Sequence, residues 1–358
     1  MDPIVTVLVP AFNRANMMGD LIKSYLAQDF QESELLIMDD CVEDNTVGAI
    51  VKFYSDNDPR IRLHKNLVNL GFAGNLREGL SKAKGKYIVV LGDDDVFAAP
   101  FALGKYVHYF DTHSDLVFIY SNILECDESL NVDYGFRYSS APVLFEPGLE
   151  SLEHVWLLSC YIPGIGLRNT PSLLNSFPSE ACLFPQVELI GKLLLDGSAM
   201  LTGEFLFAGR AHSRQLGFRF AKEKAIRPDE RHSVEELPVI ARTVAKMATQ
   251  NYGMEIEREL IDAVNRFFRE SHATILPTEK INCGNYRICK TFVMAVRNDR
   301  GTLLDLRFIS YFILSLITPK RILQSIKEVQ KKRIARKTLT MDDFHLTNGD
   351  LNSELWTK

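Results

Sequence analysis

An apolar stretch that ends in three consecutive carboxylates is the most constraining feature of this chain. It covers residues 84–96, and its apolar part leads into Gly92 and the acidic triplet, which is Asp93, Asp94 and Asp95. Apolar residues on both faces indicate a strand that is covered on both sides, as in a parallel sheet. Open α/β folds bind their ligands at the carboxyl ends of such strands. The pattern therefore predicts a ligand site at the acidic triplet.

The acidic triplet favours binding of a divalent cation. Three adjacent negative charges repel one another unless a cation neutralises them. Mg²⁺ and Mn²⁺ prefer oxygen ligands, and Mg²⁺ sites commonly combine one or two carboxylates with substrate phosphates. The alternative is a solvated turn, because aspartate is common where strands end. Further motifs along the chain favour a metal-assisted phosphate site.

Composition and charge exclude several classes of protein. The 358 residues exceed one typical domain, so two packed parts are expected. A net charge of −5 and a pI near 6.0 argue against a general nucleic-acid binder. The six cysteines form no Cys-x-x-Cys pair, which argues against a zinc site and indicates reduced thiols in a cytoplasmic protein. Residues 1–9 show no signal-peptide pattern and no apolar run approaches about 20 residues, so we expect a protein that is soluble or sits on a membrane surface.

Strands and helices alternate in the first third of the chain. Residues 4–9 are rich in β-branched residues and form a predicted strand that stops at Pro10, because proline cannot donate to a central ladder. A second strand, residues 34–38, ends in Asp39 and Asp40, which repeats the pattern of a strand followed by carboxylates. This alternation is typical of an α/β fold with a doubly wound, mostly parallel sheet, right-handed crossovers and helices on both faces. Further strands are predicted at 60–64 and 116–120. The segment 66–75 is predicted as a loop whose glycines permit close approach of the backbone to a ligand. Helices are predicted at 16–26, capped by Asn16, at 46–55, capped by Asp44 or Asn45, at 80–83 and at 101–110.

Five motifs follow one another in this part of the chain. They are Val9–Arg14; Ile37–Asp40 followed by Asp44, Asn45 and Thr46; Asn69, Leu70 and Gly71 with Asn75 and Gly79; Ala83–Tyr87; and Leu91–Asp95. Together and in this order they resemble the inverting family 2 glycosyltransferases, which have the GT-A fold. The similarity covers about the first 125 residues and continues more weakly to about residue 215.

The resemblance implies a nucleotide-sugar donor that lies across the carboxyl edge of the sheet. The acidic triplet corresponds to the family's DXD motif, with Gly92 where an aspartate often stands. By this resemblance Asp93 binds the ribose, Asp94 binds a divalent Mg²⁺ or Mn²⁺ ion that bridges the diphosphate, and Asp95 supports either. The residues expected to contact the base and ribose are Pro10, Ala11, Phe12, Asn13, Arg14 and Asp39, with Asn75 nearby.

Residues 209–213 resemble the family's Arg-x-His element, in which the histidine approaches the metal and the diphosphate. Imidazole is an acceptable ligand for Mn²⁺, so His212 would join Asp94 and Asp95 at the metal. The alternative is a structural histidine. Arg210 or Arg214 would neutralise the departing diphosphate.

The resemblance also implies a general base near the start of a later helix. The family's Glu-Asp pair, aligned on Leu189 and Gly197, falls on Pro185 and Gln186, and glutamine cannot accept a proton at physiological pH. Glu188 lies two residues further on, about 200° around a helix. It is the candidate base if the helix starts later or the register differs, and a solvated helix residue otherwise. The remaining acidic candidates are Glu180 and Glu204.

Aromatic residues beyond residue 126 are candidates for stacking against an acceptor sugar. They include the segment 134–138, Trp156 and Tyr161. The alternative is a surface hairpin with ordinary aromatic residues, and a core position for Trp156 and Tyr161.

The expected organisation is a GT-A domain followed by a helical region. Helix-like apolar spacing occurs at 233–251, 255–271 and 281–298, with Pro238 and Pro277 as punctuation. The predicted parts are a glycosyltransferase domain at 1–220, with a nucleotide-sugar-binding half at 1–125 and an acceptor half at 126–220, a helical C-terminal region at 221–340, and a mobile tail at 341–358.

Residues 303–337 combine an apolar stretch, 308–317, with many basic residues. This combination suits peripheral attachment to an anionic membrane surface, which would be useful for a lipid-linked acceptor. The alternative is a helix buried in a bundle or in a homo-oligomer, followed by a solvated basic face.

The sequence therefore predicts a metal-dependent, inverting transfer of a sugar from a nucleotide-diphosphate sugar to an acceptor hydroxyl. The resemblance implies a lipid-linked saccharide acceptor in O-antigen or capsule synthesis, at the cytoplasmic membrane surface. One alternative is a nucleotidyltransferase, although the loop Pro10–Arg14 lacks the usual glycine-rich, basic phosphate-binding pattern. Another is a non-catalytic sugar- or nucleotide-binding protein, which the absence of the Glu-Asp pair favours.

Overall fold

The computed structural model describes residues 2–42, 45–178, 182–210, 233–326 and 329. These residues form two compact units, one up to residue 210 and the other from residue 233. Four residues that the sequence singled out, Asp44, Glu180, His212 and Arg214, lie outside the described residues, as do residues 330–358.

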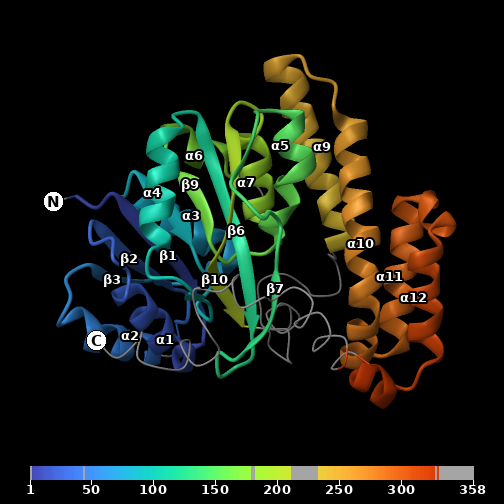
Figure 1. Ribbon diagram of the computed structural model, residues 1–358, viewed down its shortest axis with the longest axis horizontal. Coiled ribbons are helices and arrows are strands. Elements are labelled where there is room, and N and C mark those ends of the chain that lie inside the picture. Colours follow the sequence, from blue (N-terminus) through green and yellow to red (C-terminus); the bar gives the residue numbers. More distant parts are fainter. Residues whose placement is uncertain (1, 43–44, 179–181, 211–232, 327–328, 330–358) are drawn as a thin grey trace. The chain divides into compact units, whose positions relative to one another are not determined.

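A mixed sheet of ten described strands is the centre of the first unit (Figure 1). Its order is β3 (Ile61–Lys65), β2 (Ser33–Asp39), β1 (Val5–Ala11), β4 (Tyr87–Val90), β9 (Ile165–Arg168), β6 (Leu116–Cys126), β10 (Ser198–Arg210) and β5 (Val96–Phe97), with β7 (Val132–Phe136) beside β6 and β8 (Val143–Phe145) beside β10. The four strands from β3 to β4 are parallel, and β9 runs antiparallel between β4 and β6. β10 is parallel to β6, whereas β5, β7 and β8 pair in antiparallel fashion.

The strand order changes direction at β1. The chain passes outward from β1 to β2 and β3 through α1 (Ala15–Leu26) and α2 (Thr46–Ser55), and then returns through α3 (Gly71–Lys82) to β4 on the other side of β1. Because such crossovers are right-handed, α1 and α2 cover one face of the sheet and α3 covers the other. The switch point therefore lies between the carboxyl ends of β1 and β4, where open α/β sheets bind ligands.

Both faces of the inner parallel strands are buried. Val7, Leu8 and Val9 of β1 have no exposed surface, and neither have Ile88 and Val89 of β4. This two-sided cover confirms the prediction that the apolar run before the acidic triplet is a strand of a parallel sheet. It also explains why the run shows no alternation of apolar and polar residues.

The end of β1 differs from the predicted one, because the strand continues through Pro10 to Ala11. Beyond Leu8, which accepts a hydrogen bond from the Leu91 amide, β1 no longer pairs with β4. Pro10 directs its nitrogen toward that same side, so no ladder hydrogen bond is lost.

Two predicted helix starts are also wrong. α1 begins at Ala15, with Arg14 at the cap position, so Asn16 lies inside the helix and does not cap it. α3 begins at Gly71, whereas residues 66–75 were predicted as a loop and the helix as residues 80–83 only. The backbone N–H of Gly71 donates to Asn69 Oδ1 at 2.9 Å, which starts the helix before its apolar residues begin.

The remaining elements of the first unit complete the cover of the sheet. They are α4 (Ala102–Thr112), α5 (Leu149–His154), the 3₁₀ helix η1 (Trp156–Cys160), α6 (Pro171–Ser176) and α7 (Pro185–Leu193). α4 and α7 both pack on β6.

The second unit is helical, as predicted. It contains α9 (Ser233–Tyr252), α10 (Glu257–Cys283), α11 (Asn285–Asn298), the 3₁₀ helix η2 (Arg300–Leu304) and α12 (Leu306–Ile317). Pro277 was expected to interrupt the chain, but α10 runs through it, because contacts with α9, α11 and α12 hold the helix along its length. Within the described ranges, every helix is too short or too polar to cross a membrane.

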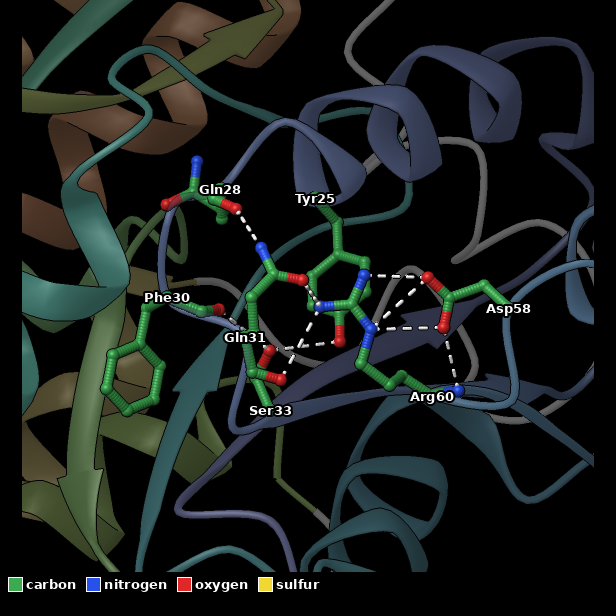
Figure 2. A network of polar contacts seen from close by, with 7 residues as sticks. All are labelled: Tyr25, Gln28, Phe30, Gln31, Ser33, Asp58 and Arg60. Carbon is green, nitrogen blue, oxygen red and sulfur yellow. Dashed lines mark hydrogen bonds and ion pairs between the residues drawn. The ribbon is translucent and has the colours of Figure 1, made fainter. Parts of the chain in front are cut away.

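A polar network fixes the amino ends of β2 and β3 (Figure 2). Gln31 Nε2 donates to the Gln28 carbonyl at 2.7 Å, and Arg60 Nη1 donates to Gln31 Oε1 at 2.7 Å. Arg60 also pairs with Asp58 at 2.6 Å and lies 5.4 Å from the centroid of the Tyr25 ring. Because this edge of the sheet is opposite the switch point, we assign the network a structural role.

Candidate functional site

Two loops meet at the switch point. The loop after β1 passes through Phe12, Asn13 and Arg14 into α1, and the loop after β4 carries the acidic triplet. Asn13 has a φ of 54°, in the left-handed region that asparagine tolerates better than most residues. On either side of this turn, the Phe12 amide and the Arg14 side chain both contact Asp93.

Asp93 joins the two loops. Its Oδ2 accepts a hydrogen bond from the Phe12 backbone N–H at 3.0 Å, and its Oδ1 accepts one from Arg14 Nη1 at 2.6 Å. The residue is only 3% exposed. Burial raises the pKa of the Asp93 carboxyl to about 6, although the guanidinium of Arg14 acts in the opposite direction. Asp93 is thus a buried link between the ends of β1 and β4.

Arg14 supplies the cation that the acidic triplet requires. Its Nη1 lies 2.6 Å from Asp93 Oδ1 and 3.0 Å from Asp94 Oδ1. Burial lowers the pKa of Arg14, but the attraction of the three carboxylates is larger in sum and raises the pKa overall. The sequence predicted that a cation must neutralise these charges, and a side chain of the protein itself supplies one positive charge to two of the three carboxylates.

Asp94 and Asp95 have different surroundings. Asp95 is buried, its Oδ2 accepts a hydrogen bond from the Gly92 backbone N–H at 2.8 Å, and burial raises the pKa of its carboxyl. A Cβ at position 92 would lie 2.7 Å from that oxygen, so glycine allows the close approach. The Asp94 side chain is 13% exposed, compared with 5% for Asp93. Asp94 is therefore the member of the triplet that is best placed to meet an external ligand.

Arg210, at the end of β10, positions the backbone of the acidic triplet. Its Nη1 donates to the Asp94 carbonyl at 3.0 Å, and its Nη2 pairs with the Asp20 carboxylate of α1 at 2.5 Å. The residue is 6% exposed. Sequence reasoning gave Arg210 a role at the departing diphosphate, whereas its observed contacts are those of a positioning residue.

A buried polar network lies at the carboxyl end of β2. Asp40 Oδ1 accepts hydrogen bonds from Asn66 Nδ2 and from the Leu70 backbone N–H, both at 2.8 Å. Asn75 accepts from Asn66 at 2.9 Å and donates to the Met38 carbonyl at 2.9 Å. Asn75, which was expected near the nucleotide, is 2% exposed and stabilises the carboxyl end of β2. Sequence reasoning missed Asn66, although a polar residue directly after the third strand was a usable signal.

Asp39 lies beside this network at the last position of β2. It is fully buried, and its Oδ1 accepts a hydrogen bond from the Cys41 backbone N–H at 3.0 Å. Its Oδ2 lies 3.8 Å from Lys65 Nζ. Asp39 is thus at the same edge of the sheet as the acidic triplet, as the sequence predicted.

The acidic triplet fits a metal ion only when a bound ligand supplies further oxygen atoms. Among the described residues, no three histidine, cysteine, aspartate or glutamate side chains are grouped so that they could hold a metal. Asp93 and Asp95 are buried, whereas the Asp94 side chain is 13% exposed, so Asp94 is the better placed carboxylate. One or two carboxylates with substrate phosphates is a common Mg²⁺ arrangement. The residues present therefore fit an ion that is shared with a diphosphate.

The region of the expected general base is the first turn of α7. The helix begins at Pro185 and not later, so Gln186 and Glu188 both lie in this turn, and a role for Glu188 as base depends on a register that differs from the family's. Gln186 is 5% exposed, and its Oε1 has no hydrogen-bond partner within the described part of the chain. Glu188 pairs with Lys192 at 2.6 Å, and both side chains are 13% exposed.

Two further residues from the sequence predictions have structural partners. Trp156 is fully buried, which favours the core position over stacking against an acceptor, and its Nε1 donates to the Val187 carbonyl at 2.7 Å. This bond fixes the first turn of α7. Glu204 pairs with Lys105 at 2.8 Å.

An aromatic cluster lies close to the acidic triplet. It comprises Tyr120, Phe136, Tyr138 and Tyr161, whose neighbouring ring centroids are 5.6 to 6.5 Å apart. The Tyr161 hydroxyl would lie 1.9 Å from a Cβ at Gly209, and the next residue, Arg210, donates to the Asp94 carbonyl. Burial raises the pKa of Tyr161, and the negative charges of Asp95, Glu125 and Asp94 raise it further. Phe136 and Tyr138 are half-buried.

The sequence of this region matches a known family. The model of glycosyl transferase family 2 matches residues 6–151, which contain both loops of the switch point and the network at the end of β2. Residues 6–151 are a family 2 glycosyltransferase domain. A relative, the GalNAc(5)-diNAcBac-PP-undecaprenol beta-1,3-glucosyltransferase of Campylobacter jejuni, is 36% identical over 94 residues, which are 26% of this chain and 30% of that protein. The chain spans between 18% and 51% of the length of eight curated relatives that it matches.

Solved structures share the fold of the glycosyltransferase domain and its helical extension. S. aureus TarS 1-349 in complex with UDP-GlcNAc has a TM-score of 0.52 at 17% identity, over 96% of this chain and 93% of that one. The mannosyltransferase PcManGT from Pyrobaculum calidifontis, in complex with GDP-Man and Mn²⁺, has a TM-score of 0.50 at 13% identity, over 93% and 88%. These likenesses and the mixed sheet confirm the predicted GT-A class.

Proposed function

We propose that this protein transfers a sugar from a nucleotide-diphosphate sugar to an acceptor hydroxyl, with a divalent metal and with inversion at the anomeric carbon. The observation that carries the proposal is the meeting of the β1 and β4 loops at the switch point of a family 2 domain. There the Asp94 carboxylate is held 3.0 Å from Arg14, at the place where such sheets bind ligands.

The donor nucleotide would lie along the carboxyl ends of β2, β1 and β4. Its base and ribose would contact the loop from Pro10 to Arg14 together with Asp39 and Asp93. In this arrangement the network of Asp40, Asn66 and Asn75 keeps the end of β2 in place. TarS with UDP-GlcNAc and PcManGT with GDP-Man support the class of donor, because both share the fold.

Asp94 would share a Mg²⁺ or Mn²⁺ ion with the diphosphate of the donor, with Asp95 in support. When bound, such an ion stabilises the negative charge that develops on the leaving nucleotide diphosphate. Arg210 keeps the Asp94 backbone in place, and Arg14 is close enough to pair with the diphosphate once Asp94 is occupied. The Mn²⁺ of PcManGT supports this assignment, and His212 is retained as a candidate ligand.

The acceptor would bind beside the aromatic cluster. Half-buried rings such as Phe136 and Tyr138 present the apolar faces on which sugar rings stack. The C. jejuni relative is named for an undecaprenol diphosphate-linked acceptor, which supports a lipid-linked saccharide in surface-polysaccharide synthesis.

Glu188 is the proposed general base, and Glu188→Gln is expected to lower the rate of transfer by about 10²–10⁴-fold. The reason is that the amide cannot accept the proton of the acceptor hydroxyl. Donor binding is expected to be unchanged, because α7 lies outside the nucleotide loops. Steady-state transfer assays and titration of donor binding measure the two effects.

The matched control is Lys192→Gln, which breaks the same ion pair at 2.6 Å and keeps the carboxylate. It is expected to retain transfer. Equal losses in the two variants would mean that the ion pair is structural and that Glu188 is not the base.

The experiment that tests the function is a panel of UDP-, GDP-, CDP- and dTDP-sugars, assayed with Mn²⁺ or Mg²⁺ for transfer and hydrolysis. We expect one donor to yield nucleoside diphosphate. Release of sugar 1-phosphate, with transfer of the nucleoside monophosphate to pyrophosphate added to the assay, would instead show a nucleotidyltransferase. Donor binding without turnover would show a non-catalytic protein, an alternative that Gln186 at the family's base position favours.

A further inference from the structure

Helix α12 has two apolar faces, and its inner face packs against other helices. Phe308 is 1% exposed and belongs to a buried cluster with Leu276 and Ile288. The rings of Phe292 and Phe312 are stacked with centroids 4.0 Å apart. This packing against α10 and α11 accounts for one side of the helix.

The outer face of α12 remains exposed although it is largely apolar. Leu306 is 80% exposed, Ile313 49%, Leu314 55% and Ile317 68%. Their spacing of seven, one and three residues places them on one stripe of a helix, opposite the packed residues. Exposed apolar residues continue the pattern on both sides of the helix, at Leu303, Leu304, Ile322, Ile326 and Val329. A concentration of this kind marks an interaction surface.

The sequence that contains and follows this outer stripe is strongly basic. Between residues 306 and 337 the sequence contains nine lysine and arginine residues and one acidic residue, Glu328, in a chain whose net charge is −5. Three of these cations are exposed next to the stripe, namely Arg307 beside Leu306, and Lys320 and Arg321 shortly after Ile317. The apolar and the basic residues therefore belong to the same short part of the chain.

We propose that η2, α12, residues 319–326 and Val329 form a docking surface for an anionic lipid bilayer. The outer stripe would enter the boundary between headgroups and acyl chains, and the cations would contact the phosphates, as in other interfacial amphipathic helices. Each cation near such a surface strengthens binding by about five-fold. This surface is independent of the proposed transfer chemistry.

Charge favours a bilayer over a second copy of this chain. A two-fold interface brings the same patch of both subunits together, so Arg307, Lys320 and Arg321 would face like charges. An anionic bilayer instead supplies the opposite charge over the whole area. A bilayer is therefore the occupant that matches both properties of the surface.

The test is co-sedimentation of the full chain with phosphatidylglycerol–phosphatidylcholine vesicles and with vesicles of phosphatidylcholine alone. We expect binding to the anionic vesicles, weakened when salt rises from about 0.1 M to about 1 M. The double variant Leu306→Ser with Ile317→Ser is expected to bind at least about ten-fold more weakly, because two exposed apolar anchors are lost.

The matched control is Tyr286→Ser with Val293→Ser on α11. These residues are 82% and 61% exposed, close to the 80% and 68% of the test pair, but they lie outside the outer stripe. This control is expected to bind within about two-fold of the unaltered protein. Charge reversal by Lys320→Glu with Arg321→Glu is a second test that leaves the apolar residues in place, and we expect it to reduce binding to anionic vesicles only.

Two results would overturn the proposal. One is absence of binding of the folded, unaltered protein to anionic vesicles. The other is a dimer by light scattering that Leu306→Ser with Ile317→Ser converts to a monomer, since the stripe would then be a protein–protein interface. Circular dichroism of each variant establishes that the helices are intact, and if the apolar variant fails to fold, the charge reversal decides.

Discussion

Replacement of Asp94 by asparagine is expected to reduce sugar transfer by about 10³-fold or more while the protein remains folded. The carboxylate is the most exposed of the acidic triplet, so its proposed partner is the metal that neutralises the leaving diphosphate. The fold should persist, because Asp93 keeps its hydrogen bonds with Phe12 and Arg14. Transfer assays with Mn²⁺ and the preferred donor, together with thermal melting of the free protein, measure both effects.

The control for Asp94 is Asp58→Asn. Asp58 also pairs with an arginine, Arg60, at 2.6 Å, but it lies at the opposite edge of the sheet. It is expected to retain transfer. If Asp94→Asn were as active as Asp58→Asn over a range of Mn²⁺ concentrations, Asp94 would have no part in binding the metal.

Gly85→Ala is expected to destabilise the first unit by about 3 kcal/mol. A Cβ at this position would lie 2.4 Å from the Thr6 nitrogen, 2.6 Å from the Val5 carbonyl carbon and 2.7 Å from the Tyr87 oxygen. All three atoms belong to the backbone of β1 and β4, so no side-chain rotation can relieve the overlap. The free energy of unfolding from urea titration measures the loss.

Gly104→Ala is the matched control within the same unit. Its Cβ would meet only Asp29 Oδ1 at 3.8 Å, and Gly104 lies inside α4, where alanine is favoured by up to about 1 kcal/mol. The same chemical change should therefore stabilise the protein at one position and destabilise it at the other. A loss at Gly104 as large as that at Gly85 would contradict the proposed steric cause.

The parallel half of the sheet could be predicted because its signal is local. A strand such as β4 shows its two-sided burial directly in its apolar residues, and the acids at its end show where it stops. The antiparallel insertion of β9 between β4 and β6 has no such signal, because it depends on pairing between segments about 80 residues apart. The course of α10 through Pro277 likewise depends on contacts with other helices.

The position of the candidate site could also be predicted, but its internal contacts could not. The ends of parallel strands meet at one edge, so Asp39, the loop after β1 and the acidic triplet were expected together. The ion pair between Arg14 and Asp93 joins residues 79 positions apart, and neither segment contains a pattern that predicts it. The ligand roles of the individual site residues, including Glu188 as base, stay predictions that the variants above can test.

The hydrogen bonds of Asp93 and Asp95 have a consequence for the thermodynamics of ligand binding. Ordering a free side chain on association costs about 0.5–1.5 kcal/mol in entropy. These two carboxylates are already held by the backbone N–H groups of Phe12 and Gly92, so this cost is met during folding and not during association. The loop is thus a preorganised receptor, in which two of the three carboxylates are fixed before a ligand binds.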